Sequence, residues 1–220
     1  MTIFLTNKYK KEQLFTMKEV ISYQEFRSRF GNRFKVTGYD SDEMSRWVVK
    51  KYLEKNKSLF NIAEIFETKK KNSVDLIITT NDGRGIAIEI KDRHFNADYY
   101  GDHVVEYNKI RGIRRQIRKG LYQRAHLISL FEDGVMVQTG DIQVMRPDAW
   151  VTQDLCNEQT MVDPLHRDKK PKYLVHYPQH IKYYFGVILD DQGEYSDIYY
   201  SNVPFQMKDA TRDINSNPLF

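Results

Sequence analysis

The chain has a single cysteine, Cys156, in its 220 residues. One thiol cannot form an intramolecular disulfide, and it cannot supply any of the zinc clusters that depend on several cysteines. No apolar run reaches about eighteen residues, the minimum for a membrane-spanning helix. The apolar start before Lys8 is too short for a secretory signal. We therefore expect a cytoplasmic protein that has no disulfide and no membrane partner.

Internal repeats, low-complexity tracts and linkers rich in proline or glycine are also missing from the sequence. The composition, 40% hydrophobic and 29% charged, is typical of a folded globular protein. We expect one elaborated domain, in which residues 1–150 form the core with an N-terminal helical extension. Residues 151–220 would form a tyrosine-rich β extension packed on the same domain. The formal net charge of +4 favours polyanionic partners without identifying one.

Hydrophobic periodicity divides the chain into helices and strands. Helices are expected at residues 17–30, 40–56 and 104–121. Strands are expected at residues 73–80, 85–91, 126–131, 134–138, 183–189 and 195–201. Residues 60–66 fit a short strand or an irregular apolar link, and residues 209–220 are expected to be loosely ordered. This pattern predicts an α/β fold with a mixed central sheet flanked by helices.

The strands on either side of residues 81–84 are predicted to pair as a hairpin. Six even-numbered positions of these strands are apolar: Val74, Leu76, Ile78, Ile86, Ile88 and Ile90. Matching these apolar sets across the hairpin requires odd positions to face odd positions, which places Asp75 beside Glu89 or Lys91. Such a register requires a loop with an odd number of residues, for example three with Gly83 in the left-handed conformation.

Two carboxylates and an ammonium on one patch suit phosphodiester hydrolysis. Magnesium is commonly held by one or two carboxylates together with phosphate oxygens of the substrate. An ammonium two residues from a metal ligand can orient a water molecule or neutralise charge that develops on the phosphate. From the residues alone, we predict a cation site formed by Asp75 and Glu89, with Lys91 beside it.

The sequence Val74-Asp75, followed after a hairpin by Glu89-Ile90-Lys91, resembles the signature of the PD-(D/E)xK nucleases. Val74 stands where the signature has proline, a departure that the family tolerates. The resemblance covers roughly residues 40–140. It implies a restriction endonuclease-like core and a magnesium-dependent nuclease that cuts nucleic acid, with DNA the expected substrate and Mn²⁺ expected to substitute for Mg²⁺.

The resemblance also implies a role for each residue of the signature. Asp75, Glu89 and the Ile90 carbonyl would bind the metal, and Lys91 would handle the attacking water. Glu43 would support a metal-bound water from the preceding helix. Glu43 has a second interpretation that is equally compatible with the sequence, because Asp40 and Glu43 also form a capping-box pair at the start of that helix.

Basic residues cluster after the signature, and two interpretations of them are open. They form a solvated helix face, or they contact the phosphates of a nucleic-acid backbone. The candidate contact residues are Arg93, His94, Lys109, Arg111, Arg114, Arg115, Arg118 and Lys119. The rival to the nuclease hypothesis is an inactive nucleic-acid-binding or protein-interaction module with the same fold. Cutting a duplex requires two active sites or two visits, and a homodimer is one assembly that would provide two sites.

Overall fold

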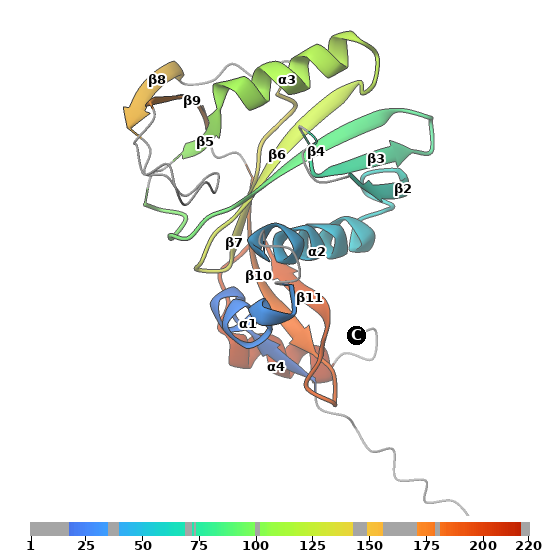
Figure 1. Ribbon diagram of the computed structural model, residues 1–220. Helices are drawn as coiled ribbons and strands as arrows, with labels where there is room; N and C mark the ends of the chain where they lie inside the picture. The colour runs from blue at the N-terminus through green and yellow to red at the C-terminus, as the bar shows by residue number, and fades with distance from the viewer. Residues whose placement is uncertain are drawn as a thin grey trace, which may run out of the picture.

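The computed structural model describes residues 18–34, 40–68, 72, 74–99, 102–142, 149–155, 171–178 and 181–216 (Figure 1). In chain order, the elements are β1 (Glu19–Ile21), α1 (Tyr23–Phe30), the 3-10 helix η1 (Gly31–Phe34), α2 (Asp40–Lys55), β2 (Ile62–Glu67), β3 (Leu76–Thr80), β4 (Gly85–Asp92), β5 (Asp102–Glu106), α3 (Tyr107–Arg118), β6 (Arg124–Leu130), β7 (Val135–Gln138), β8 (Ala149–Leu155), β9 (Pro171–Pro178), β10 (Ile181–Leu189), β11 (Tyr195–Ser201) and α4 (Met207–Ser216). Ser73 and Cys156 lie outside the described residues.

Two sheets organise these elements. The larger sheet has the strand order β1-β10-β7-β6-β4-β3-β2, with β11 also paired to β10. Strands β4 and β6 run parallel, whereas the other pairs of this sheet are antiparallel, so the sheet is mixed. The smaller sheet has the order β5-β9-β8. Strands that follow residue 150 therefore pair with strands that precede it in both sheets.

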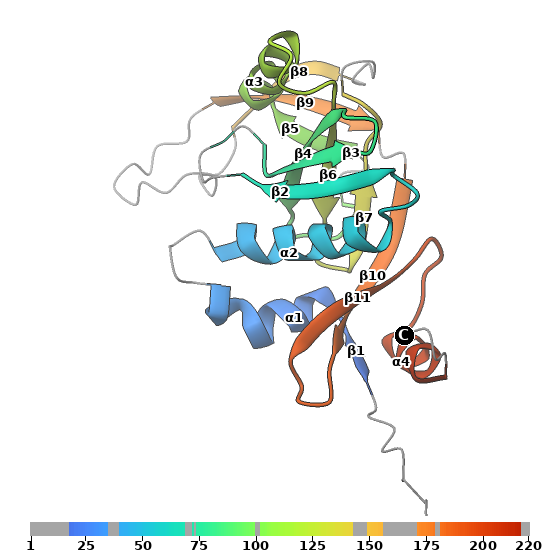
Figure 2. The same ribbon diagram turned by 90° about the vertical axis from the view of Figure 1, so that its right-hand side faces the viewer.

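Helices cover both faces of the larger sheet. In Figure 2, α1 and α2 lie next to each other beneath β2 and beside β10 and β11, where their apolar side chains share a core with β3, β4 and β6. On the opposite face, α3 and the smaller sheet enclose a second core around Ala87 and Leu127. The prediction of an α/β fold with a mixed sheet flanked by helices is confirmed. None of the described helices is both long and apolar enough to cross a membrane.

The hairpin of β3 and β4 has the predicted register. Its paired residues are Leu76 with Ile88, Ile77 with Ala87, Ile78 with Ile86 and Thr79 with Gly85. The Thr80 amide donates to the Arg84 carbonyl at 2.9 Å, which leaves a loop of three residues, 81–83. Gly83 has a φ of 77°, a conformation that glycine adopts without the cost of a Cβ clash. The odd-length loop and the left-handed glycine are both confirmed.

The hairpin departs from simple alternation at Asp75. The Asp75 amide donates to the Ile88 carbonyl at 2.9 Å, although Ile88 already faces Leu76. Two residues of one strand thus oppose one residue of the other, as in a β-bulge. Val74 consequently packs in the core that contains Ala87, and the prediction that it shares a face with Leu76 is wrong.

The first predicted helix is wrong at its beginning. Within residues 17–30, β1 pairs with β10 so that Val20 lies opposite Ile188, and only the later residues are helical. The boundary is set by Ser22, whose Oγ accepts a hydrogen bond from the Glu25 amide at 3.1 Å. A serine that satisfies this free amide is a strong N-terminal signal.

Two further predictions need correction. The helix predicted from residue 104 begins at Tyr107, because the preceding residues form β5 and pair with β9. Residues 209–216 belong to α4, which buries Ala210 and Ile214 against β1 and β10, so the expectation of loose order is wrong there. Residues 217–220 lie outside the described residues. The alternatives at residues 60–66 resolve to the strand β2.

Candidate active site: two carboxylates of the central hairpin

Glu89 is a completely buried acid in the middle of β4, with 0% of its surface exposed. Its Oε1 lies 3.2 Å from Lys91 Nζ and also contacts Lys109 Nζ. Lys91 follows on the same face of β4, whereas Lys109 comes from the first turns of α3. Oε2 is buried and has no hydrogen-bond partner within the described part of the chain. Burying a carboxylate in this way is costly, so its surroundings require an explanation.

The charges around Glu89 act in opposite directions. Burial raises the pKa of Glu89 and the neighbouring negative charge of Asp75 adds to the increase, so that with all neighbouring charges included the pKa is about 7. The positive charges of Lys91 and Lys109 oppose this increase. Burial alone would lower the pKa of Lys109, but the charge of Glu89 and its hydrogen bond outweigh burial and raise it. Glu89 and Lys109 therefore stabilise each other's charged forms.

Asp75 reaches the same region from the bulge that precedes β3. Its Oδ2 accepts a hydrogen bond of 2.7 Å from the Ile90 amide, so its carboxylate lies against the backbone that follows Glu89. Its Oδ1 accepts a hydrogen bond of 2.9 Å from Arg46 Nη2. The bulge and the two donors together hold Asp75 beside the strand that carries Glu89 and Lys91.

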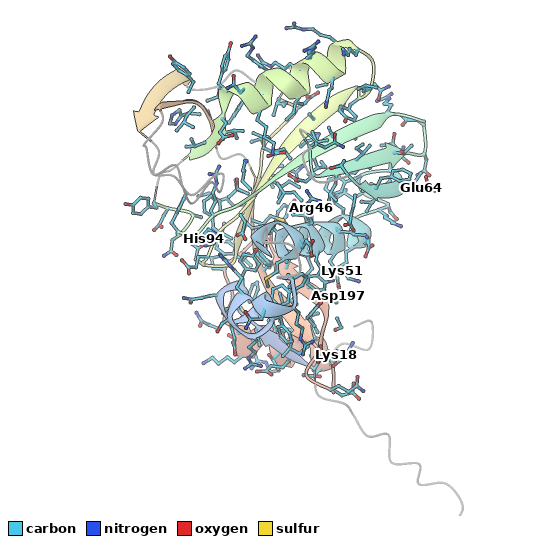
Figure 3. The ribbon with its side chains drawn as sticks, in the orientation of Figure 1. Lys18, Arg46, Lys51, Glu64, His94 and Asp197 are labelled. Carbon is cyan, nitrogen blue, oxygen red and sulfur yellow. The ribbon has the colours of Figure 1, made fainter. Side chains whose placement is uncertain are left out.

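Arg46 was not identified by the sequence analysis. It lies on α2, above which Figure 3 labels it, and its guanidinium connects that helix to Asp75. Glu43 lies three residues earlier on α2 and is half-buried. Residues three apart share a helix face, so helical spacing allows either Glu43 or Arg46 to contact Asp75 and does not favour one of them. The α2 side chain that the structure brings onto Asp75 is the arginine.

The predicted basic residues divide into two groups. Four of them have contacts within the protein: Lys109 contacts Glu89, Arg93 donates to the Val104 carbonyl, Arg114 donates to the Ile142 carbonyl, and His94, although exposed, contacts Arg27. The other four are exposed along α3 and at its end: Arg111, Arg115, Arg118 and Lys119. No acid occurs within α3, so this exposed face is uniformly positive.

The donors fit a divalent cation of the magnesium type only in part. Each carboxylate has about four acceptor positions, and at Asp75 each oxygen accepts one hydrogen bond, from Arg46 or from the Ile90 amide. Oxygen ligands of this kind suit magnesium, which keeps several waters and often uses only one or two carboxylates. The described residues contain no cluster of three or more His, Cys, Asp or Glu side chains that could hold a metal. A cation here would rely on Asp75, Glu89 and the Ile90 carbonyl, with water or substrate oxygens completing its shell.

Comparisons with known proteins do not add to this description. No protein-family model matches the chain, and no curated protein matches it significantly.

Proposed function

We propose that this protein is a magnesium-dependent nuclease of the PD-(D/E)xK kind, which hydrolyses phosphodiester bonds in nucleic acid, with DNA as the expected substrate. The observation that carries the proposal is the meeting of Asp75, Glu89 and Lys91 on the central hairpin. The buried Glu89 Oε2, which has no hydrogen-bond partner among the described residues, supports a cation ligand at that position. A restriction endonuclease-like core and a cytoplasmic homodimer belong to the same proposal.

Asp75, Glu89 and the Ile90 carbonyl would hold the magnesium ion, and Mn²⁺ is expected to replace it. When bound, the ion lowers the pKa of a water molecule and stabilises negative charge on the phosphate. Lys91 would orient the attacking water, and its ammonium, 3.2 Å from Glu89 Oε1, supports this role. Glu43 keeps its proposed role of supporting a metal-bound water from α2.

The net charge of the site also favours a phosphate ligand. Three cationic side chains, Arg46, Lys91 and Lys109, contact two carboxylates, which leaves one excess positive charge when Glu89 is ionised. A divalent cation would increase this excess. Preorganised positive charge in a buried site stabilises the charge that develops on a phosphate during hydrolysis.

The exposed basic face of α3 is proposed to follow the nucleic-acid backbone. Lys109 connects that helix directly to Glu89, so the face and the two carboxylates belong to one region of the molecule. Positive charges that contact phosphates contribute affinity that falls as the salt concentration rises. The exposed residues of this face are Arg111, Arg115, Arg118 and Lys119.

The proposal is tested by incubating the protein with Mg²⁺ and a panel of duplex, single-stranded, flap and four-way-junction DNA. Wild type should cleave at least one substrate, and chelation should stop the reaction. Asp75→Ala and Lys91→Ala should each lose about 100-fold or more of the rate. Asp82→Ala is a matched control, because Asp82 is an exposed acid of the same hairpin that pairs with Arg84. Equal rates in wild type and both active-site variants would refute the proposal.

One observation favours the rival function, a binding module without catalysis. Arg46 and the Ile90 amide already engage both oxygens of Asp75, and two lysines already neutralise Glu89. A site of this kind can be satisfied by its own cations. The binding module predicts salt-sensitive DNA binding that survives Asp75→Ala, together with no heat of Mg²⁺ or Mn²⁺ binding in titration calorimetry.

A further inference from the structure

Another acid with a buried side chain, Asp92, lies at the end of β4 and plays no part in the site described above. Only 3% of its side chain is exposed. Alternation along the strand places it on the face opposite Lys91, against α1. Arg27 of α1 approaches it, with Nη1 at 3.7 Å from Oδ1. Burial raises the pKa of Tyr23 well above its usual value, and the charge and hydrogen bond of Asp92 raise it further.

The buried Asp92 and Tyr23 restrict the position of Arg27. Tyr23 is fully buried, and the Arg27 guanidinium lies 5.8 Å from the centre of its ring. A guanidinium that is bound on one side by a carboxylate and packed against an aromatic ring has fewer conformations to lose when it binds a ligand. About 20% of the Arg27 side chain remains exposed. The fixed arginine is thus accessible from outside.

The exposed side of Arg27 meets His94. Arg27 Nη2 lies 2.5 Å from His94 Nδ1 and 3.2 Å from His94 Nε2. A guanidinium has only donors, so a ring nitrogen that bonds to it must accept, which requires a neutral imidazole. Burial lowers the pKa of His94 and the charge of Arg27 lowers it further, against the smaller opposing effect of the Glu132 charge. Two groups that both carry positive charge when protonated are therefore held in contact, an arrangement that an anion would stabilise.

We propose that Arg27 and His94 bind one backbone phosphate of a nucleic acid, and that Asp92 and Tyr23 are positioning residues for Arg27. A guanidinium has five N–H donors, so contacts with Asp92 and His94 leave donors for a phosphate. The proposal rests on the proposed function in one respect, namely that the ligand of this protein is nucleic acid.

The place of His94 in the chain links this phosphate site to the candidate active site. His94 is the third residue after Lys91, so their Cα atoms are at most about 11 Å apart. That distance corresponds to roughly three base-pair steps of 3.4 Å. Figure 3 labels His94 at the side of the molecule between α1 and the larger sheet, to the left of Arg46. Arg27 and the hairpin carboxylates lie on opposite faces of β4, so one nucleic acid would contact both by passing the end of that strand.

The test measures the salt dependence of binding, in EDTA so that no cleavage occurs. A short fluorescein-labelled DNA duplex is titrated with protein at several salt concentrations and followed by anisotropy. Arg27→Gln should reduce the slope of log K against log salt by about 0.9, the value for one lost phosphate contact. Arg29→Gln is the matched control, because it removes the same charge from α1 at an exposed residue that pairs with Glu25. Equal slopes for wild type and Arg27→Gln, or equal reductions for both variants, would overturn the proposal.

Arg27→Gln leaves Asp92 buried without its cation and can unfold the protein, so a second variant is required. The double variant Arg27→Gln/Asp92→Asn removes the buried charge together with its partner. It should melt close to wild type and show the same reduction in slope. A folded double variant with the wild-type slope would contradict the proposal as directly as the single variant.

A direct readout comes from the ring signals of His94 in ¹H–¹³C NMR spectra, assigned with His94→Gln. The duplex should move these signals in wild type and not in the double variant. Inorganic phosphate at matched ionic strength is the comparison ligand. If it binds as tightly as the duplex, the site takes free phosphate and the nucleic-acid assignment is wrong. None of these measurements depends on cleavage. The proposal for Arg27 and His94 can therefore fail while the nuclease proposal stands, and the nuclease proposal can fail while Arg27 still contacts a phosphate.

Discussion

Strand β4 carries two buried acids on opposite faces, and their surroundings differ. Glu89 faces α3 and meets two ammonium groups, whereas Asp92 faces α1 and meets a guanidinium and a phenol. Lysine is a flexible point charge that can leave a carboxylate, while arginine beside an aromatic ring is more strongly fixed. Burial alone therefore does not identify a catalytic acid. The mobility of the neighbouring cations distinguishes an acid that can exchange ligands from one that anchors a side chain.

The two acids also differ in their nearest like charge. The negative charge of Asp75 helps to raise the pKa of Glu89. Two carboxylates near one another repel, unless a cation lies between them or one of them binds a proton. At Glu89, a divalent cation would offset both the cost of burying the carboxylate and its repulsion from Asp75. Asp92 has Arg27 as its counter-charge and requires no such ion.

The largest expected effect of this difference is on catalysis. Glu89→Gln should reduce Mg²⁺-dependent DNA cleavage by about 1000-fold, or ~4 kcal/mol, because it removes a negatively charged metal ligand while keeping nearly the same shape. Asp92→Asn should cost about tenfold or less, because Asp92 acts only through Arg27. Single-turnover cleavage rates measure both effects. Equal losses in the two variants would show that the acids do not differ in the proposed way.

The next effect is on stability as a function of pH. Burial raises the pKa of Glu89 from its ordinary value of 4.5 to about 7, so the folded chain binds this proton more tightly than the unfolded chain. The contribution of Glu89 to stability is therefore complete below about pH 4.5 and is lost as the pH rises through about 7. The loss amounts to about 3 kcal/mol in the free energy of unfolding.

Urea unfolding at pH 5 and pH 8, without divalent cations, measures this loss. Glu89→Gln cannot titrate and should remove most of the pH dependence in this range. Asp92→Asn should leave the contribution of Glu89 in place. The interpretation is wrong if wild type and Glu89→Gln lose the same free energy between the two pH values.

The β3–β4 hairpin was the most predictable part of the fold, because its information is local. Matching apolar positions across a turn that contains Gly83 determines both the register and the loop length. The strands β1 and β5 were missed because both pair with strands that occur much later in the chain, β10 and β9. A pattern within one segment contains no signal for such a partner. The helix α4 was also missed, although Met207, Ala210 and Ile214 follow helical spacing.

The candidate site was predictable in its acids and less so in its cations. Asp75 and Glu89 stand out because acids are unusual in apolar strands. Arg46 could not be chosen over Glu43, because both share a helix face. Lys109 was predicted to contact nucleic acid, and the structure turns it onto Glu89. A signal for this position existed, because Lys109 directly precedes Ile110 and so borders the buried stripe of α3.

The smallest of these effects concerns the exchange of ligands at Glu89. If a divalent cation replaces the ammonium of Lys109, then Lys109→Met should bind Mn²⁺ more tightly, by about tenfold or ~1.4 kcal/mol. Two unit charges 4 Å apart interact by about 4 kcal/mol at an effective dielectric constant of 20, so this estimate allows for a lysine that partly swings away. Lys119→Met, which removes an exposed charge at the end of α3, should leave Mn²⁺ affinity nearly unchanged. Calorimetric titration with Mn²⁺ measures both variants. If Lys109→Met binds Mn²⁺ no more tightly than Lys119→Met, then Lys109 does not compete with a cation, and Glu89 would resemble Asp92 as an acid with a permanent counter-charge.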